Sequence, residues 1–412
     1  MKPYLSNFKS RIQISVKFFI SAYIFVSVHA NAETDLSRLK IPEGFKISVF
    51  ADQSLPNGQS LQRPRFMAFD PEGNLYVSLP QSNQVVVLPD RNRDGVADEV
   101  ITVAKDLNAP QGLVYTDNKL YIANEDGVVV INKERGKWAA KPTPLISGLA
   151  TGGHTLKSLK LSPDGYLFIN VGSSCNVCIE TDPTRATMLR YTLSGKPAGA
   201  LLTVGRHQQS AVWARGLRNS QGYTWHPKTG AMFATNNGSD MRTSSKNGPV
   251  NDELPPEHLN ILEGGKHYGW PHCWGIASDQ KGGQTGQMED PKFPGEAGFC
   301  KTVQAPAITF ISHSTPLGIS FLDKTAFPES YRQDAIVALH GSWNRKQPSG
   351  YKLVRVKFKQ DRPFEVVDFV TGWLQGQDAW GRPVDVVVGT DKAIYVSDDK
   401  ADVIYRITHN AK

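Results

Sequence analysis

The chain has 412 residues, 40% of them hydrophobic and 21% charged, which is long enough for one large core or two domains and excludes a disordered protein. Its formal net charge is +7, but no basic stretch is interleaved with aromatic side chains, so binding to nucleic acid has no support. The 36 glycines and 26 prolines, with few long apolar runs of helical period, favour many short strands and turns over helices.

The N-terminus resembles an export signal. Four basic residues flank or precede an apolar run at 18–28, and Ala30-Asn31-Ala32 has the small-x-small form of a cleavage site. A membrane anchor is the alternative, but the run is short for a bilayer. We expect a signal peptide over 1–32, a mature domain over 33–412 in the periplasm or secreted, and no stable membrane insertion after cleavage. Loss of the signal lowers the formal charge to +3.

A strand, an Asp/Pro/Gly turn and a second strand recur along the rest of the chain. The copies occupy residues 63–77, 109–122, 156–169, 219–234, 316–339 and 382–396. Each is followed by further strand-like runs, and repeats of this kind, with a period of roughly fifty residues, are typical of propeller blades. The pattern therefore predicts an all-β fold, a six-bladed β-propeller, with residues 45–50 adding a strand to the last blade. A β-sandwich with coincidental repeats is the alternative.

The four cysteines are an even number in a chain expected to be exported, which suggests two disulfides. Local pairing, Cys175 with Cys178 and Cys273 with Cys300, is the simplest assignment. A zinc site would instead need four thiolates from distant segments. Haem attachment fails because Ile179 stands where a histidine is required.

One acidic loop has the spacing of a calcium loop. Oxygen ligands at alternate positions, with Gly95 at the sharp turn, are the pattern that calcium loops share. The ligand positions are Asp90, Asn92, Asp94 and Asp98. The bidentate glutamate expected at the last position is replaced by Ile101, so a plain acidic turn is the alternative.

Polar residues precede the expected inner strands. Gln111, Arg218-Asn219 and Arg382 each stand at the start of such a strand, and His154 follows two glycines just before another. Inner strands of a propeller line its central channel, so these side chains are expected to converge. Arginines and amides suit an anionic, carbonyl-rich ligand, and a histidine can take a proton from a hydroxyl. Hydrogen bonding between blades, or a surface histidine, is the competing interpretation.

The long loop after residue 236 offers hard oxygen ligands. Gly238 and Ser239 supply carbonyls, and Asp252 and Glu253 supply carboxylates, which together suit calcium. Solvated loop charge is the alternative. The chain has no phosphate loop, no nucleophile elbow and no dinucleotide fingerprint after a strand, so nicotinamide, flavin and ATP binding are unsupported.

At these residues the chain resembles the soluble quinoprotein glucose/sorbosone dehydrogenases, six-bladed propellers that use pyrroloquinoline quinone (PQQ) and Ca²⁺. The resemblance covers residues 42–407 and is most specific at 213–222, 257–265, 268–271 and 340–345. The segments 174–178 and 340–345 place it nearer the sorbosone dehydrogenase-like branch.

The resemblance implies roles for individual residues. His154 would be the catalytic base, Gln111 a substrate-side residue, and Arg218 with Asn219 the cofactor contacts. The cofactor would also meet Arg382, Trp343 and Arg345, and its calcium the carbonyls of Gly238 and Ser239, while Asp252 and Glu253 resemble a second calcium loop. Two departures are Gly153, where glucose dehydrogenase has an aspartate, and Val384, where a second arginine is expected.

The implied activity is oxidation of a small-molecule sugar or sugar aldehyde by hydride transfer to PQQ, with His154 as general base. The electron acceptor, a quinone or a cytochrome, is left open. A calcium-dependent lactonase and a non-catalytic binding propeller are the alternatives. The lactonase needs no arginine cluster for a cofactor's carboxylates, and the binding propeller leaves the channel histidine and the metal loop without a purpose.

Overall fold

The computed structural model describes residues 34–55, 61–201, 203–204, 207–277 and 286–410, and residues 34–412 form one compact unit. The expected signal peptide lies outside the described residues. Within them, the only α-helix is the short α1 (Glu329–Arg332), and no helix is long and apolar enough to cross a membrane. The all-β expectation is confirmed.

Six antiparallel sheets follow one another along the chain, and we number them as blades 1 to 6 in chain order. Each blade has four strands, given below from the innermost to the outermost, and a short fifth strand also pairs with blade 2. Blade 1 consists of β2 (Met67–Phe69), β3 (Leu75–Leu79), β4 (Gln84–Leu88) and β5 (Ile101–Ala104). Blade 2 consists of β6 (Leu113–Thr116), β7 (Lys119–Ala123), β8 (Gly127–Glu134) and β10 (Thr143–Ser147). Blade 3 consists of β11 (Leu159–Leu161), β12 (Tyr166–Val171), β13 (Thr187–Thr192) and β16 (Val212–Arg215).

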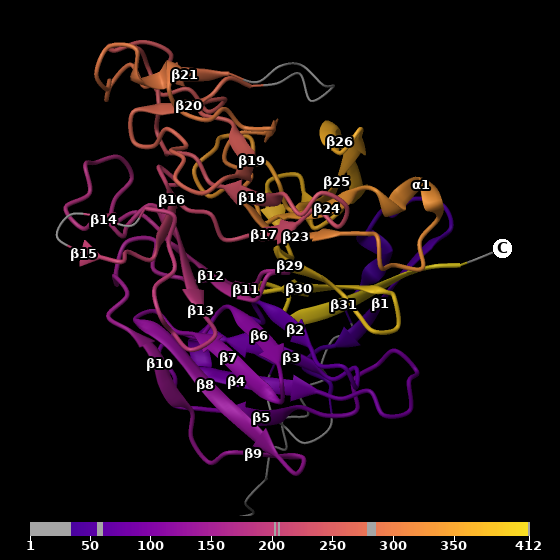
Figure 1. The fold of residues 1–412 in the computed structure, drawn as a ribbon. Coiled ribbons are helices and arrows are strands. Elements are labelled where there is room, and N and C mark those ends of the chain that lie inside the picture. The colour runs from indigo at the N-terminus through magenta and orange to yellow at the C-terminus, as the bar shows by residue number, and fades with distance from the viewer. Residues whose placement is uncertain (1–33, 56–60, 202, 205–206, 278–285, 411–412) are drawn as a thin grey trace, which may run out of the picture. The chain divides into compact units, whose positions relative to one another are not determined.

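The remaining blades have the same internal order. Blade 4 consists of β17 (Tyr223–Trp225), β18 (Met232–Asn236), β19 (Glu257–Leu262) and β22 (Ile308–Phe310). Blade 5 consists of β23 (Pro316–Phe321), β24 (Ala335–Leu339), β25 (Lys352–Lys359) and β26 (Arg362–Val370). Blade 6 consists of β29 (Pro383–Val388), β30 (Ile394–Asp398), β31 (Val403–His409) and β1 (Phe45–Ala51). Figure 1 shows the inner strands β2, β6, β11, β17, β23 and β29 gathered at the centre.

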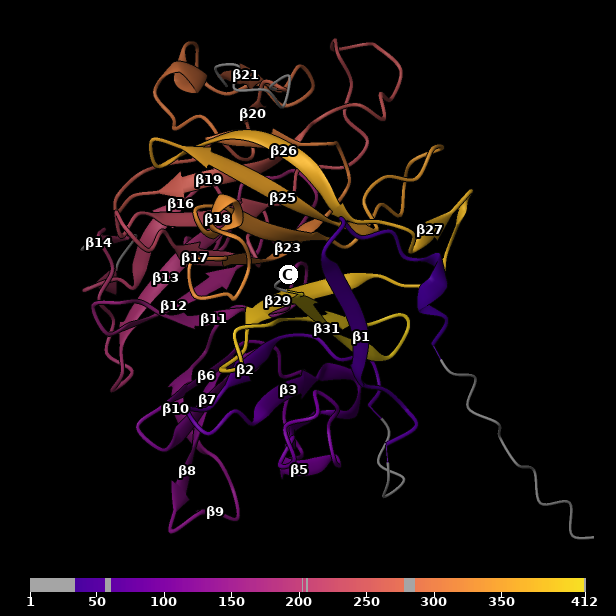
Figure 2. The ribbon, with the colours of Figure 1, turned by 90° about the vertical axis from the view of Figure 1, so that its right-hand side faces the viewer.

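The ring is closed by strands from the two ends of the described chain. β1 pairs antiparallel with β31, from Phe45 opposite His409 to Ala51 opposite Ile404 (Figure 2). This is the closing strand that the segment 45–50 predicted. Closure matters because a strand from the start of the described chain completes the last blade and so ties the two ends of the propeller together.

Six apolar clusters lie between neighbouring blades, one at each of the six junctions. At the junction of blades 6 and 1, for example, Tyr395 and Ile404 share a cluster with Leu75 and Val77. Each large apolar side chain buried in this way contributes about 1.5–3 kcal/mol. A sheet covered on both faces has no polar side, which is why β3, β18, β24 and β30 are buried along their whole length.

Shorter elements decorate the blades. They are η1 (Leu36–Arg38), η2 (Pro80–Ser82), η3 (Phe299–Lys301), β9 (Lys137–Trp138), and the hairpins β14 (Thr203–Val204)/β15 (His207–Gln208), β20 (Cys273–Gly275)/β21 (Gln287–Glu289) and β27 (Leu374–Gln375)/β28 (Asp378–Ala379). Both predicted disulfides are present. Cys273–Cys300 ties β20 to η3, and Cys175–Cys178 closes a loop between β12 and β13.

Candidate active site

Every blade places a polar residue just before its inner strand. In blade order these residues are Arg65, Gln111, His154, Arg218, Thr315 and Arg382. Because the inner strands run in the same direction in each blade, their starts meet at one end of the ring. A cavity of about 240 Å³ lies there, and four of the six residues line it: His154, Arg218, Thr315 and Arg382.

His154 is held against the end of β12. Its backbone N–H donates to Ser173 O at 2.9 Å, and its Nδ1 lies 3.1 Å from the same oxygen and 2.9 Å from Ser173 Oγ. The approach is close because Gly172 has no side chain. A Cβ there would stand 2.5 Å from the His154 Cβ.

The Ser173 hydroxyl fixes the tautomer of this histidine. Ser173 Oγ donates to Cys175 O at 2.7 Å, so toward His154 it offers a lone pair, as does Ser173 O. We therefore assign the proton to Nδ1 and leave Nε2 unprotonated. Burial, with the charge of Arg218, lowers the pKa of His154 to about 4. The imidazole is thus neutral at neutral pH, with a basic nitrogen that has no partner among the described residues.

Arg218 is buried and held rigidly. Nε donates to Asn176 O at 3.1 Å, while Nη2 donates to Asn176 Oδ1 at 3.0 Å and to Asp240 Oδ2 at 2.9 Å. The other oxygen of Asp240 accepts from Asn344 Nδ2 at 2.8 Å. A positive charge is thereby fixed in the cavity wall, near enough to His154 to lower the pKa of its imidazole.

A second carboxylate, that of Glu257, lies in the same wall. The side chain is almost fully buried, and Oε2 accepts from Gly238 N at 2.5 Å. Burial raises the pKa of Glu257 to about 7, even though Gly238 N–H and Arg218 favour its charged form. Next to it, the buried Asn237 Oδ1 has no hydrogen-bond partner. The site therefore has unmet oxygen acceptors, and a cation would satisfy them.

A second arginine, Arg382, also lines the cavity. Arg382 donates from Nε to His340 O at 3.1 Å and from Nη2 to Gly341 O at 2.8 Å, so no carboxylate of the described chain pairs with it. The nearby Asp399 is already engaged, accepting from His340 Nε2 at 2.8 Å and Arg65 Nη1 at 2.6 Å. Burial lowers the pKa of His340 to about 4, so this histidine is neutral as well.

Gln111 does not line the cavity. It is buried, and its Nε2 donates to Gln221 Oε1 at 3.1 Å, while Gln221 Nε2 donates to Asn219 Oδ1 at 3.2 Å. Asn219 does reach the cavity. Gln111 thus supports the cavity through a chain of amides.

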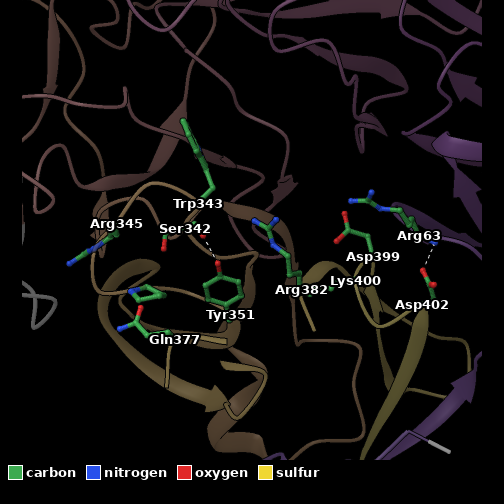
Figure 3. A pocket seen from close by; sticks show the side chains of 11 residues that line it. Arg63, Ser342, Trp343, Arg345, Tyr351, Gln377, Arg382, Asp399, Lys400 and Asp402 are labelled. Carbon is green, nitrogen blue, oxygen red and sulfur yellow. Dashed lines mark hydrogen bonds between the residues drawn. The ribbon is translucent and has the colours of Figure 1, made fainter. Parts of the chain in front are cut away.

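A larger cavity of about 670 Å³ adjoins the first one and shares Trp343 and Arg382 with it. Figure 3 shows Trp343, Arg382, Tyr351 and Arg63 around it. Its lining carries Arg63, Arg345, Arg382 and Lys400 against two carboxylates, those of Asp399 and Asp402. Trp343 is 69% exposed and stands where the two cavities meet.

The other predicted metal residues lie outside the small cavity. Ser239 is buried beside Gly238 but does not line the cavity. Glu253 forms an ion pair with Arg345, and Asp252 Oδ2 accepts from Lys346 N at 2.9 Å, so both join two loops. Asp90 accepts from the backbone N–H groups of residues 94 and 95, which closes its loop on itself.

The sequence interpretation did not single out several residues of the site, among them Asn176, Glu257 and His340. Glu257 begins a strand after a long loop, which is a weak signal, and nothing in its neighbourhood predicts that the carboxylate is buried. Asn176 and His340 stand in segments recognised only as family motifs. Their roles depend on contacts with residues more than 40 positions away.

Known proteins resemble this chain in sequence and in fold. A protein of Borreliella burgdorferi is 28% identical over 404 residues, covering 93% of this chain and 94% of its own. A PQQ-dependent pyranose dehydrogenase of Coprinopsis cinerea is 22% identical over 425 residues, and the match covers 90% of this chain but only 54% of that protein. This chain therefore matches about half of the Coprinopsis enzyme.

The solved structure of the PQQ domain of the Coprinopsis cinerea pyranose dehydrogenase, in its holo form, superposes with a TM-score of 0.73. The sequences are 20% identical, and the match covers 90% of this chain and 97% of that domain. At this identity the match establishes the fold. The TrAA12-like family model matches residues 39–410, so the chain belongs to the TrAA12-like family, which confirms the kinship with PQQ-dependent sugar dehydrogenases that the sequence motifs indicated.

Proposed function

We propose that this protein is an exported, calcium-dependent quinoprotein that oxidises a sugar or sugar aldehyde, with His154 as general base. One observation carries the proposal. A neutral histidine with a free Nε2 lines the same cavity as two arginines and two acidic side chains. Kinship with sugar dehydrogenases that use PQQ supports the same conclusion.

The side chains fit a carboxylate-bearing, carbonyl-rich cofactor. Arg218 and Arg382 both line the cavity; Arg218 pairs with Asp240, whereas Arg382 pairs with no carboxylate of the described residues. The cavity of about 240 Å³ is below the range of about 300–1,000 Å³ typical of ligand sites. The adjoining cavity of about 670 Å³ brings the combined space into that range (Figure 3). Asn219 and Asn344 add amides for ring carbonyls.

The acidic side of the cavity fits calcium. Glu257, Asp240 and Asn237 present oxygen atoms, and Gly238 adds a backbone carbonyl. A divalent cation would restore the charged form of Glu257, whose pKa burial raises. We assign the cofactor's calcium to this group, and treat Asp252 with Glu253, and the loop at Asp90, as further proposed calcium positions.

When bound, PQQ accepts a hydride and calcium withdraws electron density from the cofactor as a Lewis acid. The chain's own residues do the rest. His154 Nε2 takes the proton of the substrate hydroxyl. Ser173 O and Oγ, both facing Nδ1–H, stabilise the imidazolium that forms. Arg218 supplies a fixed positive charge where negative charge grows.

Substrate access fits the larger cavity. It is lined by polar side chains and by the exposed ring of Trp343, and a sugar ring commonly packs on such an aromatic face. Export, from the N-terminal signal expected at 1–32, would place this oxidation in the periplasm or outside the cell.

The proposal is tested by titrating purified apoprotein with PQQ and calcium and then offering aldoses and sorbosone with a reducible dye. Saturable cofactor binding and sugar-dependent dye reduction are expected. A calcium-dependent lactonase would instead hydrolyse lactones without PQQ, and a binding propeller would show neither activity. Arg218 and Arg382 favour the quinoprotein, because a lactonase has no use for them.

A further inference from the structure

The loop closed by Cys175–Cys178 lies between His154 and Arg218. It leaves β12 at Gly172, the glycine packed on His154. The backbone N–H of its first residue, Ser173, donates to Arg218 O at 2.8 Å. The hydroxyl of Ser173 is in turn fixed by Cys175 O. One short loop therefore contacts both the base and the arginine of the site.

Asn176, in the middle of this loop, makes five hydrogen bonds, four of them to the site residues Arg218 and Asp240. Its carbonyl accepts from Arg218 Nε at 3.1 Å and from Trp270 Nε1 at 3.2 Å. Its Oδ1 accepts from Arg218 Nη2 at 3.0 Å and from Asp240 N at 2.8 Å, and its Nδ2 donates to Asp240 O at 2.9 Å. The side chain thus uses both lone pairs of Oδ1 and one of its two N–H groups.

The exposure of Asn176 makes this arrangement informative. Asn176 is exposed to solvent, whereas Arg218 is only 4% exposed. An exposed asparagine that was only a loop residue would be free to bond with water. Here both ends of the amide hold the segment that carries Asp240, and the same oxygen holds the guanidinium that pairs with Asp240. The amide therefore sets the distance between the positive and the negative group of the cavity wall.

The disulfide explains how an exposed residue can do this. A bridge between positions three residues apart leaves few conformations to the two residues inside it, so Asn176 is ordered before any partner binds. Without the bridge, the loop would have to lose that freedom each time Arg218 and Asp240 are brought into register.

We propose that Asn176 is a positioning residue for the oxidation proposed above, and that the Cys175–Cys178 bridge is what holds it in place. The inference rests on the proposed function, because it assigns Arg218 and Asp240 to the cofactor and its calcium. It predicts that an exposed side chain and a surface disulfide control cofactor affinity and turnover while contributing little to folding.

The test compares Asn176→Ala with Asn132→Ala, an equally exposed asparagine on β8 whose side chain makes no hydrogen bond within the described residues. Asn176→Ala should weaken PQQ binding in the presence of calcium, and lower kcat, by about 10- to 100-fold, since hydrogen bonds to charged groups are lost. The sugar KM and the thermal midpoint should change little. Asn132→Ala should match the wild type throughout.

The double variant Cys175→Ser/Cys178→Ser should reproduce the same losses, and combining it with Asn176→Ala should add little, because both changes release the same groups. Cys273→Ser/Cys300→Ser is the matched disulfide control and should lower the thermal midpoint instead. Asn176→Asp, which keeps the acceptor for Arg218, should recover part of the cofactor affinity.

Three outcomes would overturn the proposal. Asn176→Ala could bind PQQ and turn over like the wild type, its losses could only track a lower thermal midpoint, or the losses of the two changes could be fully additive. Failure of the proposed function itself looks different, because the wild-type protein would then neither bind PQQ nor reduce the dye.

Discussion

The Nδ1 atom of His154 lies 2.9 Å from Ser173 Oγ and 3.1 Å from Ser173 O, and both oxygens act as acceptors toward it. This pairing directs the free lone pair of the imidazole to Nε2. Neither partner is charged, and burial with the charge of Arg218 lowers the pKa of His154 although its hydrogen bond to Ser173 favours the protonated form. The base is built to be neutral before the reaction and stabilised as a cation during it.

His154→Ala should lower kcat by about 10²- to 10⁴-fold, the contribution typical of a general base, while PQQ binding stays within a few-fold of the wild type. Ser173→Ala is the companion variant. It removes the hydroxyl but keeps the carbonyl acceptor, so a smaller loss is expected. Steady-state kinetics with dye reduction and a separate cofactor titration measure the two effects. Full turnover by His154→Ala would remove this histidine from the mechanism.

The pH dependence of kcat/KM should show an acid limb near pH 4, well below the value of about 6.5 for an unperturbed histidine. His154 acts as a base only when it is unprotonated, so kcat/KM falls as the pH drops through the pKa of this histidine. A pH–rate profile of the holoenzyme checks this. A limb near 6.5 would mean that the imidazole is solvated, contrary to the geometry.

Stability should also depend on pH, through two buried and two half-buried histidines. His154, His258, His267 and His340 all have a pKa lowered to about 4, chiefly by burial. Between pH 6.5 and 4 the unfolded chain binds more protons than the folded one at these residues, so they reduce the free energy of unfolding as the pH falls through this window. Urea unfolding at pH 7 and pH 5 measures the difference. Equal stability at both values would contradict it.

Glu257→Gln should weaken calcium binding at least about tenfold, because a buried carboxylate ligand is replaced by a neutral amide of the same shape. Glu253→Gln is the control. That side chain is 66% exposed and pairs with Arg345. Calcium titration of the two variants separates a site at Glu257 from one at the loop of Asp252 and Glu253, and a larger loss in Glu253→Gln would favour the loop.

Gly172→Ala should impair turnover more than folding. The added methyl would stand 2.5 Å from the Cβ and 2.6 Å from the carbonyl oxygen of His154, so the imidazole must move. A displacement of about 1 Å is enough to cost on the order of 100-fold in rate. Gly165→Ala, in a turn of the same blade with open space around it, should cost only about 1 kcal/mol of stability through its positive φ. Equal rates for both would argue against a critical placement of His154.

The sequence predicted the architecture well because the repeated unit is local. Each strand–turn–strand copy is written in consecutive residues, and the closing strand at 45–50 has nowhere else to pair once six blades are counted. The disulfides were equally accessible, since both join nearby cysteines. The convergence of His154, Arg218 and Arg382 followed from one rule, that inner strands begin at the same end of a propeller.

The remaining features depend on contacts between blades. Gln111 follows the same rule yet does not line the cavity, and it is linked to Asn219 in the cavity wall through Gln221. The burial of Glu257 and the reach of Asn176 to Asp240 are set by how two long loops fold over each other. Their roles as metal ligand and positioning residue remain proposals, as do those of the residues carried over from the resemblance.

Stopped-flow absorption of PQQ-loaded protein tests the central claim most directly. In one turnover with an aldose, and with calcium present, wild-type protein should reduce the bound cofactor, and His154→Ala should bind the same cofactor with little loss of affinity but reduce it at least about 100-fold more slowly. Failure of the wild-type protein to bind or reduce PQQ, or equal rates of reduction in the two proteins, would contradict the assignment.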